Sequence, residues 1–324
     1  MTEDYSEGII KGSRRALAKA MSLVESSRES DFYQSQQLLL KMLPHTGNSL
    51  RIGITGSPGV GKSTLIEEFG LHLIEQGKRV AVLAVDPSSR RSGGSILGDK
   101  VRMPRLAREQ NAFIRPSPSG GALGGVARKT RECMLLCEAA GFDVIIVETV
   151  GVGQSETEVS SMVDLFMVLL LPNAGDEIQG IKRGIMEVAD LVVITKSDGE
   201  YVLKAEEARS RFKSALRLML AKPNGWRPKV LTTSAVEAKG INDLWTACRE
   251  FYENVERRSF LKDMRRGQSK EWLHQILNHE LLRTFYHNEN VLKKLPEFEK
   301  LVFEQEMLPA SAAAELLKVF KTSF

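Results

Sequence analysis

The sequence predicts an α/β fold in which a doubly wound, mainly parallel sheet is extended by helices at both ends of the chain. Between about residues 50 and 257, short apolar runs alternate with amphipathic helical patterns, which is typical of repeated β–α units. Several apolar runs are continuous, as in strands that helices cover on both faces. On either side of this region the periodicity is helical.

These patterns divide the 324 residues into three parts. Residues 1–45 are predicted to form a helical extension, residues 46–257 the α/β domain, and residues 258–324 a C-terminal helical arm. Apolar residues at helical spacing mark the first part: Leu17, Ala20, Met21 and Val24. A similar stripe marks the last: Trp272, Ile276, Leu277, Leu281, Leu282 and Phe285. These terminal helices could cover the α/β domain or meet a second subunit.

The strands of the α/β domain are predicted from apolar and β-branched runs. They are Arg51–Thr55, Arg79–Val85, Ala112–Arg115, Asp143–Val147, Leu165–Leu171, Leu191–Thr195 and Lys229–Thr233. Gly77 and Gly141 each follow a helical pattern and precede a strand, where glycine commonly ends a helix. Right-handed crossovers place the loops that follow the strands along one edge of the sheet. Polar motifs after several strands are therefore expected to converge there.

Composition narrows the class of protein. Apolar residues make up 42% of the chain and charged residues 27%, as in an ordinary globular protein. A net charge of +4 is too small to indicate nucleic acid or a membrane surface as a partner. Three cysteines give no disulfide framework, and Cys133 and Cys137 are expected to pack in the core. No apolar run approaches the roughly 20 residues of a membrane helix, so a cytoplasmic location is expected.

The most specific motif follows the first predicted strand. Residues 56–63 read Gly-Ser-Pro-Gly-Val-Gly-Lys-Ser, and a helical pattern follows. Backbone N–H groups of such a loop can surround a phosphate, and the helix N-terminus adds favourable partial charge. Lys62 can reach the β- and γ-phosphates, and the Ser63 hydroxyl can ligate Mg²⁺. The predicted nucleotide contacts here are Gly56, Ser57, Pro58, Gly59, Val60, Gly61, Lys62, Ser63 and Thr64.

Carboxylates near the same sheet edge are predicted to hold Mg²⁺ together with Ser63. Asp86 and Glu148 end the second and fourth strands, and Asp99 lies in the loop after the second strand. Asp86, which precedes a proline, could instead be a turn residue. Gly151 can bring a backbone N–H against the γ-phosphate, a contact that hydrolysis would remove. We therefore expect a nucleotide-dependent switch after Glu148, with Lys62, Glu148 and Gly151 in the catalytic set.

A second motif predicts the base. Residues 195–198 read Thr-Lys-Ser-Asp, which resembles the Asn/Thr-Lys-x-Asp motif of GTP-binding proteins. The Asp198 carboxylate can accept hydrogen bonds from the N1–H and 2-amino groups of guanine, donors that adenine does not offer in that geometry. The Lys196 stem can cover the base plane. The pocket is predicted to be completed by Ser234, Ala235 and Val236. The expected cofactors are GTP or GDP and Mg²⁺.

Longer segments resemble one family, the MeaB/MMAA GTPases, once often labelled ArgK or LAO/AO transport kinases. The matching segments are Ala84–Ser89, Gly93–Lys100, Val147–Glu156 and Gln179–Gly184. The resemblance covers nearly the whole chain. It implies a chaperone of adenosylcobalamin-dependent methylmalonyl-CoA mutase, with weak GTP hydrolysis that the mutase stimulates and with GTP state gating cofactor loading. It also implies a homodimer formed through the C-terminal arm, and a further switch that contains Lys182.

Other functions remain open at this point. A nickel-delivery type of metallochaperone GTPase shares the nucleotide-domain design, but five scattered histidines and three cysteines supply no metal store. A kinase acting on a small molecule or protein would fit the older family label, although the Lys-x-Asp motif argues against ATP. A nucleotide-gated scaffold without turnover is also possible, because Lys62 and the Mg²⁺ ligands serve binding and hydrolysis alike. Which acyl-CoA mutase is served does not follow from the sequence.

Overall fold

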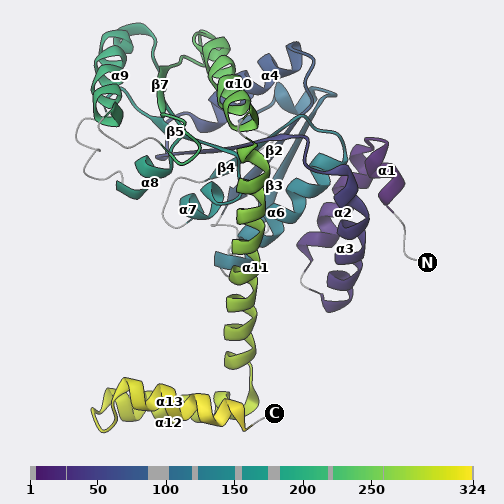
Figure 1. Cartoon of the computed structure of the whole chain (residues 1–324), viewed down its shortest axis with the longest axis vertical. Helices are drawn as coiled ribbons and strands as arrows, with labels where there is room; N and C mark the ends of the chain where they lie inside the picture. Colours follow the sequence, from purple (N-terminus) through teal and green to yellow (C-terminus); the bar gives the residue numbers. More distant parts are fainter. Residues whose placement is uncertain are drawn as a thin grey trace. The chain divides into compact units, whose positions relative to one another are not determined.

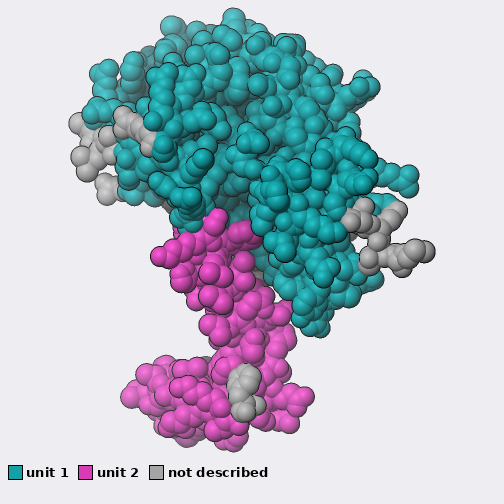
Figure 2. Space-filling model, turned by 45° about the vertical axis from the view of Figure 1, so that its right-hand side comes forward, with its two compact units in different colours: residues 1–268 teal, residues 269–324 magenta. Residues whose placement is uncertain are grey.

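The computed structural model describes residues 5–26, 28–86, 102–118, 123–149, 155–173, 183–217, 222–257 and 259–322. The chain divides into two compact units, residues 1–268 and residues 269–324 (Figure 2). Unit 1 contains the sheet, and unit 2 is helical. Among the described residues, no helix is both long and apolar enough to cross a bilayer.

A central sheet crosses unit 1 (Figure 1). It has seven strands in the order β3-β2-β4-β1-β5-β6-β7. The strands are β1 Leu50–Gly56, β2 Val80–Asp86, β3 Ala112–Pro118, β4 Val144–Thr149, β5 Leu165–Leu170, β6 Leu191–Ile194 and β7 Lys229–Thr232. All neighbouring strands are parallel. The predicted doubly wound α/β fold is therefore confirmed. The largest difference is in β3, which continues to Pro118 instead of ending at Arg115.

Helices cover both faces of this sheet, which explains why its strands are continuously apolar. One core cluster includes Ile52 and Ile54 of β1 together with side chains of α4 and α10. The other includes Ile145 and Val147 of β4 together with side chains of α6 and α7. The helices named here are α4 Lys62–Glu75, α6 Leu123–Ala139, α7 Ser155–Ser160 and α10 Ile241–Arg257. Unit 1 also contains α8 Arg183–Val188, α9 Val202–Arg217 and the 3₁₀ turns η2 Leu106–Arg108 and η3 Gly199–Tyr201.

Within residues 5–26 and 28–45, three helices contribute side chains to the second of these clusters, and a 3₁₀ turn follows them. They are α1 Ser6–Ile10, α2 Arg14–Glu25, α3 Glu29–Met42 and η1 Leu43–His45. The stripe predicted for α2 is buried as expected: Leu17, Ala20, Met21 and Val24. The Arg115 guanidinium of β3 forms an ion pair with Glu25, which joins the end of α2 to the sheet. The extension is thus packed against the sheet domain through both apolar and ionic contacts.

Of the last three helices, the first begins in unit 1 and ends in unit 2, and the other two belong to unit 2. They are α11 Phe260–Tyr286, α12 Glu289–Phe303 and α13 Pro309–Lys321. The Asn288 side chain caps α12 by accepting from the backbone N–H groups of Asn290 and Val291. Many large apolar side chains of unit 2 are exposed: Leu273, Leu277, Leu281, Leu282, Tyr286, Leu292, Phe303, Leu308 and Leu317. Several of them belong to the stripe predicted for the arm.

Three strands are each preceded by an aspartate whose carboxylate caps the neighbouring strand. The strands are β4, β5 and β6. The carboxylate-to-N distances are 2.7 Å for Asp143 with Arg79, 2.9 Å for Asp164 with Arg51 and 2.8 Å for Asp190 with Phe166. Each bond satisfies a backbone donor at the amino edge of the sheet, where the parallel ladder begins. We call these three residues the aspartate caps.

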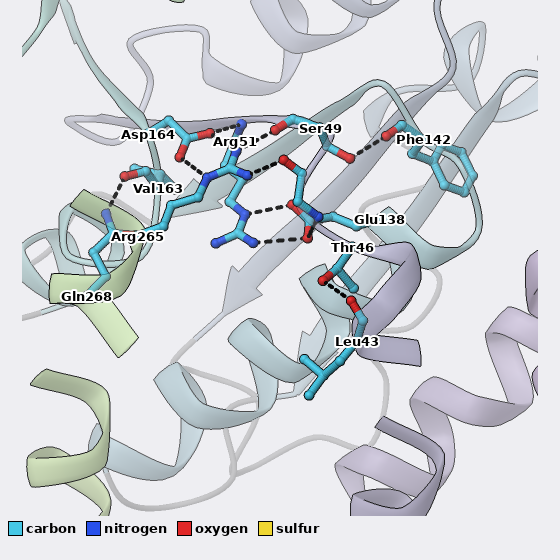
Figure 3. Close-up of polar contacts among 11 residues, drawn as sticks. Leu43, Thr46, Ser49, Arg51, Glu138, Phe142, Val163, Asp164, Arg265 and Gln268 are labelled. Atoms are coloured by element: carbon cyan, nitrogen blue, oxygen red, sulfur yellow. Dashed lines mark hydrogen bonds and ion pairs between the residues drawn. The ribbon is translucent and has the colours of Figure 1, made fainter. Parts of the chain in front are cut away.

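The Asp164 cap also binds the start of α11 (Figure 3). The Arg265 guanidinium lies 2.8 Å and 2.6 Å from the two carboxylate oxygens of Asp164. It also donates to the carbonyls of Gly47 and Ser49, at 2.6 Å each. The Asp164 carboxylate is fully buried. A paired, bidentate guanidinium is the arrangement that makes such a buried carboxylate tolerable. The first turns of α11 are thus bonded to the segment that enters β1.

Candidate nucleotide-binding site

The phosphate loop lies between β1 and α4, as the sequence predicts. Gly61, which precedes α4, has a φ of 97°, a left-handed conformation that glycine adopts without strain. A Cβ atom on Gly56 would lie 2.7 Å from the carbonyl oxygen of Leu169 in β5. The loop therefore leaves the sheet too close to the neighbouring strand for a side chain at that position. These two glycines are required by backbone geometry, for two different reasons.

Lys62 reaches back across this loop. Its ammonium donates to the carbonyl oxygens of Gly56 at 2.7 Å and Ser57 at 3.1 Å. The residue is only 9% exposed, so the positive charge is held inside the loop and not in solvent. A buried cation at the N-terminus of a helix is suited to an anion of high charge, such as the β- and γ-phosphates of a nucleotide.

Ser63 and Glu148, which are 85 residues apart in sequence, are brought into contact. The Ser63 hydroxyl donates to Glu148 Oε1 at 3.1 Å. Glu148 pairs with Ile54 in the ladder between β4 and β1, so its position is fixed by the sheet. A hydroxyl and a carboxylate oxygen are the ligand types that Mg²⁺ prefers. The donor set therefore fits the metal that the sequence predicts.

The base motif lies at the ends of β6 and β7. The Ser234 hydroxyl donates to Asp198 Oδ2 at 2.5 Å, and the Ser197 N–H donates to the Thr233 carbonyl at 3.0 Å. Ser234 thus acts through its side chain, which orients the carboxylate predicted to read guanine. Lys196 has a φ of 54°, a left-handed conformation that is uncommon for a side chain of this kind. Such local strain is found disproportionately at binding sites.

The base motif and the phosphate loop touch each other. The Thr195 hydroxyl lies 2.7 Å from the Val60 carbonyl, and it is also 3.2 Å from the Leu170 carbonyl. The Lys196 Cε atom lies 4.0 Å from where a Cβ on Gly61 would be, so its stem passes along the loop. Thr195 was not among the predicted site residues. Its position at the start of the motif was the available signal, but the contact with Val60 depends on the fold.

The remaining predicted site residues differ in burial, and some lie outside the described part of the chain. Val60 is fully buried, so it can contribute to the loop only through its backbone, whereas Val236 is 84% exposed at the rim of the base motif. Ala235 is half-buried and Thr64 is exposed. Asp86 ends β2, but its side chain is outside the description. Asp99, Gly151 and Lys182 lie outside the described residues, and their roles stay predictions.

The described ranges contain no group of three or more His, Cys, Asp or Glu side chains that could hold a metal ion. Cys133 and Cys137 are buried in the core on α6. Burial raises the pKa of the Cys137 thiol, which keeps it protonated and unsuited to binding a metal. The described part of the chain thus offers the oxygen ligands of a magnesium–nucleotide site and no cluster typical of stored transition metals.

Comparison with known proteins agrees with this geometry. The family model described as "Methylmalonyl Co-A mutase-associated GTPase MeaB" matches residues 17–290. The chain is 48% identical to "GTPase ArgK" of Escherichia coli over 97% of its own length and 95% of that protein. It is 46% identical to the mouse "Methylmalonic aciduria type A homolog, mitochondrial" over 97% of its length and 78% of that protein.

A solved structure gives the same answer for the fold. "LAO/AO transport system kinase" superposes with a TM-score of 0.80 at 42% identity, covering 98% of this chain and 96% of that one. Relatives from Mycobacterium tuberculosis, 51% identical over 95% of the chain, are named probable GTPases. With its phosphate loop, base motif and these relatives, the protein is a P-loop GTPase that binds GTP and GDP, and it belongs to the MeaB family.

Proposed function

We propose that the protein is a G-protein chaperone of an adenosylcobalamin-dependent acyl-CoA mutase. In this proposal its GTP state gates cofactor loading and protects or reactivates the mutase, and methylmalonyl-CoA mutase is the first candidate partner. The observation that carries the proposal is the match of residues 17–290 to a family described by its association with that mutase. The name of the mouse relative, which refers to methylmalonic aciduria, points to the same metabolism.

The described residues support a role in binding the phosphates, the metal and the base, and we assign the switching to residues outside them. Lys62 lies inside the loop, where its ammonium can neutralise the charge of the β- and γ-phosphates. Ser63 and Glu148 would hold Mg²⁺ together with Asp86 and Asp99, and the ion would neutralise charge that develops on the phosphates. Asp198 selects guanine. Gly151 and Lys182 are assigned to the switches that respond to the γ-phosphate and to the partner.

Among the described residues around the phosphate loop no general base is evident, which is compatible with such a timer. Hydrolysis of GTP depends mainly on positioning and on charge stabilisation, and a partner can supply or order the missing groups. In this proposal the free protein hydrolyses GTP slowly, and docking of the mutase speeds hydrolysis. In this proposal the mutase carries out the substrate chemistry, and GTP hydrolysis serves to change the conformation of the GTPase.

A homodimer through the helical arm is part of the proposal. The arm, residues 258–324, presents exposed leucines on α11, including Leu273, Leu277 and Leu281. These residues are four apart and lie on one face of the helix. Exposed apolar stripes of this kind mark interaction surfaces in soluble proteins. Light scattering should give twice the 36.0 kDa chain mass, and a Leu273→Glu, Leu277→Glu variant should give the monomer mass.

The test of the chaperone is a mixing experiment. GTP hydrolysis is measured with and without a purified adenosylcobalamin-dependent methylmalonyl-CoA mutase, and co-elution is followed on a sizing column. We expect the rate to rise at least about tenfold and a complex to form with a non-hydrolysable GTP analogue. A Lys62→Ala variant is the control for contaminating hydrolysis. Absence of both stimulation and co-elution with acyl-CoA mutases would contradict the chaperone role and leave the GTPase itself intact.

Additional measurements on the same purified protein separate the other functions. A scaffold without turnover would form the complex but show no phosphate release in either state. A metallochaperone would bind nickel or another transition metal at a stoichiometric site. A kinase would transfer label from the γ-phosphate of GTP to an acceptor and not to water. The described residues contain no metal-binding cluster, which argues against the metallochaperone, and the Lys-x-Asp motif at residues 196–198 argues against a kinase that uses ATP.

A further inference from the structure

Two threonines meet near the carboxyl ends of β1 and β4. Thr55 is the residue before Gly56, and Thr149 is the residue after Glu148. The Thr149 hydroxyl donates to the Thr55 hydroxyl at 2.8 Å, and both residues are 1% exposed. A hydrogen bond between two buried hydroxyls contributes through its own energy and because breaking it leaves a buried polar group unsatisfied.

This side-chain bond lies beyond the last residues that pair β1 with β4. The ladder between β1 and β4 ends with Ile54 opposite Glu148. Beyond this pair β1 continues along β5 to Gly56, and β4 continues along β2 to Thr149. The Thr55–Thr149 bond therefore joins β1 and β4 one residue further than the register of the ladder.

The threonine bond and the Ser63–Glu148 bond lie on opposite faces of the sheet. Side chains alternate along a strand, so Thr55 shares a face with Gly53, and Ile54 lies on the other face. A Cβ on Gly53 would lie 3.0 Å from Val159 of α7, which places the threonine pair on the α7 side. Glu148 instead contacts Ser63 at the start of α4. The end of β4 is thus held from both faces, once at Glu148 and once at the next residue.

We infer that Thr55 and Thr149 are positioning residues for the GTPase reaction. Their bond fixes the spacing between the ends of β1 and β4, and through it the distance between the Glu148 carboxylate and the Ser63 hydroxyl. The inference rests on the proposed role of these two groups as Mg²⁺ ligands. Neither threonine touches the nucleotide in this scheme, so their removal acts on the metal-dependent part of binding and not on phosphate or base contacts.

The test measures affinity for a fluorescent GDP analogue with and without Mg²⁺. Thr149→Val and Thr55→Val replace a hydroxyl by a methyl of nearly equal size. We expect the gain in affinity that Mg²⁺ provides to fall about tenfold in either variant, while the metal-free affinity changes less than about twofold. In single turnovers of GTP the rate at saturation should fall more than the apparent affinity does. Thr149→Ser keeps the hydroxyl and should restore the Mg²⁺ effect to within about twofold.

Two comparisons make the result specific. The double variant Thr55→Val, Thr149→Val should be no worse than Thr55→Val alone, because that substitution already removes the shared bond. Ser49→Ala is the matched control: Ser49 is 2% exposed, and its hydroxyl donates to the Phe142 carbonyl at 2.5 Å, so it joins the segments that enter β1 and β4 at the opposite edge of the sheet. It should leave the Mg²⁺ effect unchanged. If Thr149→Val does not fold, Thr55→Val carries the same test from the other side of the bond.

The failures of the two linked ideas can be told apart with Glu148→Gln. If Glu148→Gln leaves the Mg²⁺ effect unchanged, the proposed metal role of Glu148 is wrong and the inference falls with it. If Glu148→Gln lowers the effect but both valine variants retain it, the positioning role alone is wrong. Loss of thermal stability with an unchanged Mg²⁺ effect would likewise overturn the inference, since the threonines would then serve only the fold.

Discussion

The two edges of the central sheet are held together by different kinds of contact. At the amino edge, each aspartate cap binds a backbone N–H, and Asp164 and Asp190 also bind a basic side chain, Arg265 and Lys222. At the carboxyl edge the contacts join motifs to one another: Ser63 with Glu148, Ser234 with Asp198, and Thr195 with the phosphate loop. The amino edge is thus built of fixed charge pairs, and the carboxyl edge of groups suited to bind a ligand. Substitutions at the two edges should therefore affect different properties.

The largest expected effect is on stability, at the amino edge. Arg265→Ala leaves the fully buried Asp164 carboxylate without its guanidinium, which should lower the free energy of unfolding by about 3–5 kcal/mol. Urea unfolding of the purified protein measures this. The neighbouring Arg266→Ala is the control, because its ion pair with Asp263 is solvent-exposed and should contribute less than about 1 kcal/mol. Equal changes in the free energy of unfolding for the two substitutions would contradict a larger contribution from the buried ion pair.

Lys62→Ala tests the opposite behaviour at the carboxyl edge. The rate of GTP hydrolysis should fall at least about a hundredfold, because a fixed positive charge at the phosphates is lost. The free energy of unfolding should change by less than about 1 kcal/mol, since the lost hydrogen bonds are to two loop carbonyls. Phosphate release and urea unfolding are measured on the same preparation. Undiminished hydrolysis would show that this loop is not the reactive site.

Asp198→Asn should change selectivity while leaving both stability and the reaction nearly intact. Affinity for GDP is expected to fall about ten- to a hundredfold, because one charged acceptor for two guanine donors is replaced by an amide. Affinity for xanthosine diphosphate should rise, since the amide can donate to its 2-oxo group. Fluorescence competition with GDP, XDP and ADP gives the three affinities. Similar binding of GDP and ADP by the unaltered protein would contradict the guanine assignment.

The smallest effect is a pH dependence at the Asp190 cap. Burial raises the pKa of this carboxyl, and the Lys222 ammonium opposes part of that shift. A raised pKa means that the folded protein binds the proton more tightly than the unfolded chain does. Protonation of Asp190 therefore stabilises the fold as the pH falls from neutrality toward the usual aspartate pKa, and this contribution is lost as the pH rises again.

Comparison with Asp190→Asn isolates this contribution. The difference in free energy of unfolding, unaltered protein minus variant, should increase between pH 7 and pH 4.5. Other carboxylates titrate in the same range, but they are common to both proteins and cancel in the difference. A difference that shrinks over this range would show that the ion pair with Lys222 outweighs burial.

The sequence was sufficient to predict the strands and the two nucleotide motifs. Strands buried on both faces leave continuous apolar runs, and this pattern survives without knowledge of their neighbours. Each of the two motifs, the phosphate loop and residues 195–198, is a continuous stretch of sequence, so the order of its residues alone indicates its chemistry. Ser63 and Glu148 were correctly expected to lie at the same sheet edge, because loops that follow parallel strands converge there.

Contacts that depend on strand order could not be predicted. An aspartate precedes each of three apolar runs, as in Ala189-Asp190-Leu191, and this repeat is visible in the sequence. Which N–H each carboxylate accepts follows only from the order β2-β4-β1-β5-β6, in which β5 and β6 alone are neighbours both in space and in sequence. The Thr55–Thr149 bond has the same origin, since it needs the register of β1 against β4. The features that could be predicted depend on local sequence, whereas those that could not depend on pairing between distant segments.

The aspartate caps also determine the register of each strand against its neighbour. A parallel ladder is uniform, so sliding one strand by two residues would keep every side chain on its own face and restore most backbone bonds. Such a slip would take the Asp164 carboxylate away from the Arg51 N–H and from Arg265 while leaving it buried. The caps therefore penalise slipped alignments that the apolar pattern alone would accept. Because β1 runs directly into Gly56, the alignment chosen at one edge of the sheet determines where the phosphate loop begins at the other.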